Sequence, residues 1–258
     1  MVEPDAQPKK GSLSMKNDPY VMATFLKARE QDKWAADGTR PIVTLSRQHG
    51  SGGSQIALRA TELLSEKKHG GHPWIVVDKE IAERVINDHH LPARISKFLS
   101  EKEATSVEGR IDGLLGFAVP YETIIRKMAQ TMVQIAKLGH VILVGRAAHV
   151  ITAGFPRALH VRIIGSLEKR VERIMESENC SRDKAAARIM ETDELRRHFA
   201  ARHFKVDLND PAQYDLTINT DRVTLEDAAQ VIVHTVSLPH FRDEEARHLV
   251  ELRHLVLD

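Results

Sequence analysis

The chain has 258 residues, of which 42% are hydrophobic and 28% are charged, close to the averages of soluble globular proteins. Its 37 basic and 36 acidic residues leave a net charge of +1, so no overall charge draws it to nucleic acid or to an anionic membrane. A single cysteine excludes an internal disulfide and a multi-cysteine metal site. With no apolar run near the ~18 residues of a membrane span, and no secretory-signal core in the first twenty residues, a soluble cytoplasmic protein is expected.

Composition divides the chain into three regions. Residues 1–39 predict a partly disordered arm, because the first 17 are rich in Pro, Lys, Ser and Gly and a short amphipathic helix over 18–34 follows. Residues 40–237 carry the regular patterns of a folded domain, and 238–258 predict a charged tail helix.

Strand and helix patterns alternate through the central region. Short β-branched or alternating apolar runs predict strands over 42–45, 74–77, 140–144, 158–164 and 214–219. Apolar residues at helical spacing predict helices over 56–64, 121–138, 167–175, 184–203 and 225–236, the last three capped by Ser166, Ser181 and Thr224. Such alternation predicts an α/β fold with a parallel sheet covered on both faces, and ligands bound beyond the carboxyl ends of its strands.

A glycine-rich loop separates the first predicted strand from the first predicted helix of this region. It contains Gly50, Ser51, Gly52, Gly53 and Ser54. Glycines let backbone N–H groups approach a phosphate chain closely, and the helix that follows adds its positive N-terminal end. The pattern predicts a phosphate-binding loop; the alternative is a purely structural turn.

This loop lacks one part of the phosphate-loop pattern G-x-x-x-x-G-K-[ST]. With Gly52 at the second glycine position, Ser54 stands at the hydroxyl that binds Mg²⁺, but Gly53 stands where lysine is required. Catalysis then needs a cation from elsewhere, and Arg47, at the first position of the pattern, is a candidate. The alternative for Arg47 is a salt bridge that only fixes the loop.

Four blocks carry a resemblance to a known family: 42–53 (IVTLSRQHGSGG), 76–80 (VVDKE), 141–148 (VILVGRAA) and 214–221 (YDLTINTD). Together they resemble the cytidylate kinase-like family of phosphate-loop proteins, which characteristically has Gly at the lysine position. The resemblance covers roughly residues 40–237. It implies a three-layer P-loop NTPase fold with a five-stranded parallel sheet, and transfer of a phosphoryl group from ATP, with Mg²⁺, to CMP or a similar nucleoside monophosphate.

The resemblance also implies roles for parts of the chain. Residues 79–120 would be a helical insertion that binds the acceptor monophosphate, and 181–210 a helical lid. The loop would hold the donor phosphates, with Ser54 at the magnesium ion. Asp78 would lie near the acceptor, and Arg146 would touch the acceptor's phosphate or base. The Gly-Arg-Asp block of bacterial cytidylate kinases is Gly-Arg-Ala here, with Ala147 in place of Asp.

The predicted lid is rich in arginine. Guanidinium groups on a mobile lid would stabilise the charge that phosphoryl transfer spreads over the moving group, and the candidates are Arg196, Arg197 and Arg202, with Arg188 on the same stretch. The alternative is a solvated basic face paired with Glu191, Asp193 and Glu194. Arg126 is a weaker acceptor-binding candidate, since it also fits an ordinary surface position, and the cations of the insertion are Arg84, Arg94, Lys97 and Arg110.

Three functions are consistent with these residues. The first is a nucleoside monophosphate kinase that takes ATP and a small-molecule acceptor. The second is a nucleotide-binding regulatory or interaction module that kept the fold and lost the reaction, because Gly53 and Ala147 replace a lysine and an aspartate. The third is a kinase for another small-molecule acceptor. The fourteen histidines show no spacing typical of zinc enzymes.

Overall fold

The computed structural model describes residues 40–66, 73–78, 121–238 and 241. The predicted arm, the insertion over 79–120 and nearly all of the tail helix lie outside the described residues. No helix within the described ranges is long and apolar enough to cross a membrane.

Five parallel strands form one sheet in the order β2-β3-β1-β4-β5. They are β1 (Ile42–Arg47), β2 (Ile75–Val77), β3 (Val141–Val144), β4 (Ala158–Ile164) and β5 (Leu216–Asn219). All five predicted strands are confirmed, although β1 continues two residues further than predicted and β5 begins two residues later. The extension matters, because it makes Arg47 the last residue of the central strand.

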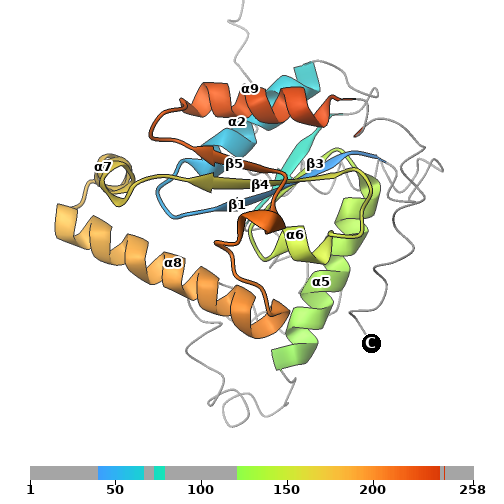
Figure 1. Cartoon of the computed structure of the whole chain (residues 1–258), viewed down its shortest axis with the longest axis horizontal. Coiled ribbons are helices and arrows are strands. Elements are labelled where there is room, and N and C mark those ends of the chain that lie inside the picture. The colour runs from blue at the N-terminus through green and yellow to red at the C-terminus, as the bar shows by residue number, and fades with distance from the viewer. Residues whose placement is uncertain (1–39, 67–72, 79–120, 239–240, 242–258) are drawn as a thin grey trace, which may run out of the picture. The chain divides into compact units, whose positions relative to one another are not determined.

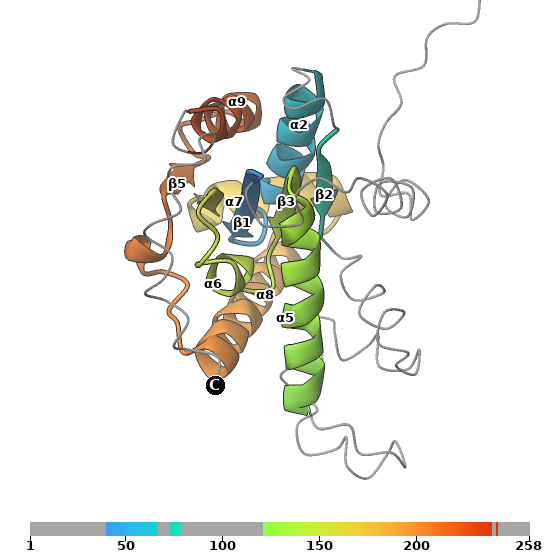
Figure 2. The same ribbon diagram turned by 90° about the vertical axis from the view of Figure 1, so that its right-hand side faces the viewer.

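Helices cover both faces of the sheet, so the predicted three layers are confirmed (Figures 1 and 2). α2 (Gly53–Glu66) and α9 (Leu225–Val236) pack side by side on one face. α5 (Tyr121–Leu138), α6 (Ala148–Ile151) and α8 (Arg182–Phe204) lie on the other, and α7 (Leu167–Glu178) follows β4 and packs against α8. α6 and a short 3-10 helix, Pro211–Gln213, were not predicted, because neither is long enough to show a helical period.

The central strand β1 has two unlike faces. Val43 and Leu45 are fully buried in the apolar core, together with residues of α2 and α9. Burial of such side chains stabilises a fold by about 1.5–3 kcal/mol each. Thr44 and Ser46 point to the opposite face, where they are also buried. The strand is therefore buried on both sides, as predicted, but one side is polar.

Three predicted helix caps are confirmed. The Ser166 hydroxyl accepts a hydrogen bond from the backbone nitrogen of Lys169, and that of Ser181 from the backbone nitrogen of Lys184. The Thr224 hydroxyl accepts from the backbone nitrogen of Asp227 at 3.1 Å. These caps fix where α7, α8 and α9 begin. Because β1, β4 and β5 are parallel, the turns after β4 and β5 lie at the same edge of the sheet as the glycine loop.

Candidate active site

The glycine loop joins β1 to α2 at the carboxyl edge of the sheet. Gly50 and Gly52 have φ angles of 77° and 82°, in the left-handed region that favours glycine. A Cβ on Gly50 would lie 2.8 Å from the backbone oxygen of Arg170, and one on Gly52 would lie 2.5 Å from a methyl carbon of Leu225. Both positions therefore require glycine in this arrangement of the loop.

The backbone amides of the loop divide into two groups. The nitrogen of His49 donates to the Asp193 carboxylate at 2.7 Å, and that of Ser51 donates to the backbone oxygen of Gln48 at 3.3 Å. Within the described ranges, the remaining amides donate to no protein group; they belong to Gly50, Gly52, Gly53, Ser54 and Gln55. Three of these are the first amides of α2, at its positive end. The loop can thus offer several donors to one anion.

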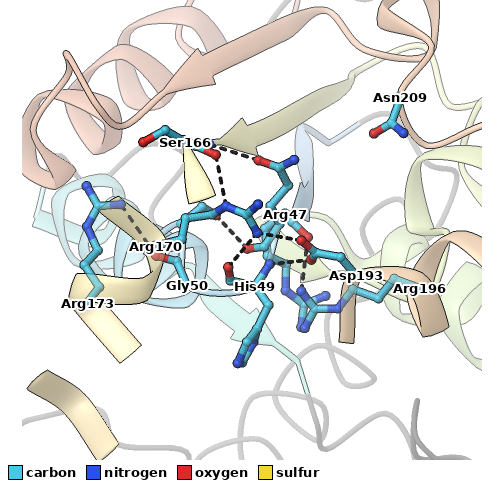
Figure 3. Close-up of polar contacts among 12 residues, drawn as sticks. Arg47, His49, Gly50, Ser166, Arg170, Arg173, Asp193, Arg196 and Asn209 are labelled. Atoms are coloured by element: carbon cyan, nitrogen blue, oxygen red, sulfur yellow. Dashed lines mark hydrogen bonds and ion pairs between the residues drawn. The ribbon is translucent and has the colours of Figure 1, made fainter. Parts of the chain in front are cut away.

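The loop carbonyls, in contrast, are held by the protein. Arg170 donates to the oxygen of His49 at 3.1 Å, and Arg173 reaches the oxygen of Gly50 at 3.5 Å (Figure 3). The Thr220 hydroxyl donates to the oxygen of Ser51 at 3.1 Å. Three successive carbonyls are therefore bound by α7 and by the turn after β5, which keeps the loop in one shape.

Helix α8 is tied to the same loop. Asp193 accepts from His49 and, at 2.5 Å, from the guanidinium of Arg170, whose side chain is only 9% exposed. Arg196, one turn along α8, donates to the backbone oxygen of Arg47 at 3.1 Å (Figure 3). Burial and the nearby Arg196 lower the pKa of His49. The lid predicted from the sequence contacts the loop through these two side chains.

Asp78 connects Arg47 to Ser54. One carboxylate oxygen accepts from Arg47 at 3.1 Å, and the other accepts from the Ser54 hydroxyl at 3.2 Å. The side chains of Arg47 and Asp78 are 11% and 16% exposed. The salt bridge that the sequence left as an alternative for Arg47 is thus present, and Asp78 lies against the phosphate loop itself.

These residues fit a magnesium ion delivered with a nucleotide. Mg²⁺ prefers oxygen ligands and usually takes only one or two from protein, with water and phosphate oxygens as the others. The Ser54 hydroxyl and the Asp78 carboxylate provide two oxygens beside the unpartnered amides. The described ranges contain no cluster of three or more metal-binding side chains.

A strained turn follows β3. Gly145, Arg146 and Ala147 have φ angles of 80°, 55° and 53°, three successive residues in the left-handed region. Two of them are not glycine, and such strain, costing of order 1 kcal/mol or more per residue, is typical of functional sites. The turn directs the chain into α6 and sets Arg146 at the wall of a pocket.

This pocket lies between the polar face of β1, α6 and α8. Three arginines are among the residues that line it: Arg47, Arg146 and Arg196. The remainder of its wall is mostly small or apolar, and no carboxylate of the described residues lines it; the wall contains Thr44, Leu45, Ser46, Gly145, Ala147, Ala148, His149, Phe199, Ala200 and Leu208. The lining therefore combines three basic residues with small and apolar ones.

A buried polar layer supports the pocket from the sheet. The Arg162 guanidinium donates to the Ser46 hydroxyl at 2.7 Å and lies 5.8 Å from the centre of the Tyr214 ring. His149 stacks on Tyr214 at 4.9 Å between ring centres. Burial, together with the charges of His160 and Arg162, lowers the pKa of His149 to about 3, so that ring is neutral near pH 7.

The other predicted site arginines are exposed on their helices. Arg197 is exposed and pairs with Glu194, as the solvated-face alternative expected. Arg188 pairs with Glu178, and Arg202 is exposed in the last turn of α8. Arg126 is exposed on α5.

Sequence reasoning placed residues 219–221 at this edge of the sheet but missed Arg170 and Arg173, which bind the loop carbonyls. These two arginines carry no local pattern, since each meets the loop across more than 100 residues of chain. The one signal available was their position after strand β4, whose carboxyl end shares an edge with that of β1.

The strand order, the glycine loop between β1 and α2, and the hydroxyl at its end define a P-loop NTPase fold. A model of the cytidylate kinase-like family matches residues 42–222, and the chain belongs to this family. Membership supports nucleotide-dependent phosphoryl transfer as the chemistry of the site.

Individual relatives are distant. The chain is 25% identical over 154 residues to a cytidylate kinase of Methanocaldococcus jannaschii, covering 59% of this chain and 86% of that protein. It is 24% identical over 162 residues to a cytidylate kinase of Pyrococcus horikoshii, covering 63% of this chain and 81% of that protein. A crystal structure of an uncharacterized protein from Eubacterium ventriosum has the same fold, with a TM-score of 0.55 at 20% identity over 76% of this chain and 98% of the other.

Proposed function

We propose that the chain transfers the γ-phosphoryl group of ATP to a nucleoside monophosphate, with CMP as the first acceptor to test. The observation that carries this proposal is the set of loop amides that have no protein partner within the described ranges, those of Gly50 and of residues 52–55, beside the Ser54 hydroxyl and the Asp78 carboxylate. Backbone amides at a helix N-terminus bind phosphate oxygens, and the oxygen pair is suited to a nucleotide-bound Mg²⁺.

On the donor side, the loop amides would bind the β- and γ-phosphates and hold them still. Arg170 and Arg173 already fix the loop carbonyls, so little rearrangement is needed when the phosphates bind. Mg²⁺ would be held by Ser54 and Asp78 with the phosphate oxygens, and would neutralise charge between the β- and γ-phosphates.

On the acceptor side, the candidates are Asp78, which pairs with Arg47, and Arg146, which lines the same pocket as Arg47. Arg146 would bind the acceptor phosphate, and Arg126 on α5 is a second candidate for contact with the acceptor. Of the lid arginines, Arg196 is placed to reach the transferred group, because it already touches the loop. Arg197 and Arg202 would take part only if α8 moves on binding.

The reaction is a direct displacement. An oxygen of the acceptor monophosphate attacks the γ-phosphorus of ATP, the bond from that phosphorus to the β,γ-bridging oxygen breaks, and ADP leaves with the electron pair. The products are ADP and a nucleoside diphosphate. Because the acceptor phosphate is already ionised near neutral pH, no side chain has to remove a proton.

The test is release of ADP from MgATP in the presence of CMP, UMP, AMP or GMP, each measured against ATP alone. Acceptor-dependent ADP release, with the matching diphosphate detected by chromatography, is the expected result. Tight MgATP binding without turnover with any acceptor would instead favour the regulatory module, which Gly53 at the lysine position and Ala147 at the aspartate position make a serious second candidate.

A further inference from the structure

The space over Gly53 is filled by the side chain of Arg47. A Cβ built on Gly53 would lie 2.7 Å from the Cβ of Arg47 and 2.9 Å from its Cγ. The Cβ of Arg47 is fixed by the backbone of β1, so it cannot move away without a shift of the strand. Any side chain at position 53, a lysine included, is therefore incompatible with Arg47 in this arrangement.

The far end of the same side chain rests on a second glycine. A Cβ on Gly145 would lie 2.0 Å from the Nη1 atom of Arg47. Gly53 begins α2 and Gly145 follows β3. The Arg47 side chain therefore passes close to two separate elements, at a glycine in each. From there the guanidinium reaches Asp78, which in turn contacts the Ser54 hydroxyl.

We propose that Arg47 is a catalytic residue that replaces the missing phosphate-loop lysine, and that Gly53 is a glycine because the Arg47 side chain crosses it. This inference rests on the proposed function. The lysine of the ordinary pattern reaches the β- and γ-phosphates from position 53. Here the cation comes from position 47, passes over position 53, and ends beside the hydroxyl and carboxylate that fit Mg²⁺.

The chemistry of the replacement is favourable. A guanidinium is always charged, carries five N–H donors in a plane, and binds two phosphate oxygens at once, which a lysine cannot do. The Arg47 side chain is 11% exposed and is held at its backbone by Arg196, so it is oriented before nucleotide arrives. A charge that is already positioned acts on the transition state without reorganisation.

A purely structural salt bridge between Arg47 and Asp78 is the competing explanation, and a two-residue exchange separates the two. Arg47→Gly with Gly53→Lys turns residues 47–54 into G-Q-H-G-S-G-K-S, the complete phosphate-loop pattern. The exchange removes the bridge to Asp78 but restores a cation from the usual position. It also removes the clash that Gly53→Lys would suffer alone.

The experiment measures the dissociation constant of MgATP by calorimetry, and ADP release with CMP, in five proteins. They are the wild type, Arg47→Gly, Gly53→Lys, the double variant, and Arg182→Ala as a control that loses an exposed arginine of α8. Thermal unfolding shows which variants are folded. We expect Arg47→Gly to bind MgATP at least tenfold more weakly and to lose at least a hundredfold in turnover. The double variant should recover to within about tenfold of the wild type, Gly53→Lys should not recover, and Arg182→Ala should match the wild type.

The outcomes separate this inference from the proposed function. If the wild type binds MgATP and turns over, but folded Arg47→Gly does so within threefold, the role of Arg47 is wrong and the function stands. If Gly53→Lys alone is as active as the wild type, the steric argument is wrong. If Arg47→Gly does not fold, recovery in the double variant still supports the proposal, and a folded but inactive double variant overturns it. If the wild type does not bind MgATP, both the role of Arg47 and the proposed function are wrong.

Discussion

The carboxylate of Asp193 lies 2.7 Å from the backbone nitrogen of His49, so α8 holds the glycine loop directly (Figure 3). The same carboxylate pairs with the nearly buried Arg170, which binds the backbone oxygen of His49. One peptide of the loop is thus clamped on both sides by an ion pair between α7 and α8. The position of α8 and the shape of the loop are therefore coupled.

Asp193→Asn should weaken this clamp. The variant keeps the size of the side chain but leaves the Arg170 charge without its carboxylate, and since Asp193 is 27% exposed we expect a loss of about 2 kcal/mol in the free energy of unfolding. Urea denaturation measures the loss, and hydrogen exchange of residues 48–54 should become faster. Asp183→Asn, in the exposed first turn of the same helix, is the control. Equal stability of the two variants would show that the clamp is unimportant.

Gly50→Ala should damage the loop much more than a glycine replacement elsewhere. The alanine would have to adopt a φ of 77° and would place its Cβ 2.8 Å from a backbone oxygen, which costs at least about 1–2 kcal/mol. Gly154→Ala is the matched control, because a Cβ there meets nothing within 4 Å. The midpoint temperature of thermal unfolding and the affinity for MgATP should both fall for Gly50→Ala and remain unchanged for Gly154→Ala. Comparable behaviour of the two would contradict the close packing of the loop.

His149 should make the fold sensitive to acid. Its pKa is about 3 in the folded protein and about 6.5 when unfolded, so below pH 6.5 only the unfolded chain binds the proton. Stability is therefore lost as pH falls from 6.5 towards 3, by about 2 kcal/mol at pH 5 for this one group.

His149→Phe keeps a ring against Tyr214 and removes this titration. The difference in free energy of unfolding between pH 7 and pH 5 should shrink by about 2 kcal/mol in this variant. Replacing the exposed His234 by Gln should leave the difference as it is in the wild type. An unchanged pH dependence in His149→Phe would mean that this imidazole is not kept neutral by the fold.

Ala147→Asp should raise the preference for cytosine. Ala147 lines the pocket at a φ of 53°, a conformation that Asp adopts more readily than Ala. The new carboxylate would accept a hydrogen bond from the exocyclic amino group of CMP, and UMP lacks that group, so the dissociation constant of CMP should fall about tenfold relative to that of UMP. Calorimetry with both nucleotides provides the comparison, and parallel changes for the two would place the base outside this pocket.

The sheet and the loop could be predicted because their signals are local. Ile42–Leu45 and the glycines after them stand side by side in the sequence, and apolar spacing marks α2 within one helical length. The end of β1 could not be predicted, because Ser46 and Arg47 are polar and yet continue the strand. They continue the strand because they pair with Arg162 and Ile163 of β4. These partners lie far along the chain, so no local pattern reveals the pairing.

The contacts that make the site depend on folding as a whole. No spacing rule connects Asp193 to His49, or places the Arg47 side chain across Gly53 and Gly145. The sequence raised Arg47 as the replacement cation only because the lysine was missing. The path of its side chain became visible when strands β1 and β3 were brought together.

The most direct test of the site is a crystal structure of the full chain with Mg²⁺ and a non-hydrolysable ATP analogue. The β- and γ-phosphate oxygens should lie within about 3 Å of the amides of Gly50, Gly52, Gly53 and Ser54, with the Arg47 guanidinium in contact with one of them. A nucleotide bound elsewhere, with those amides turned to other protein groups, would contradict both the phosphate loop and the reaction built on it.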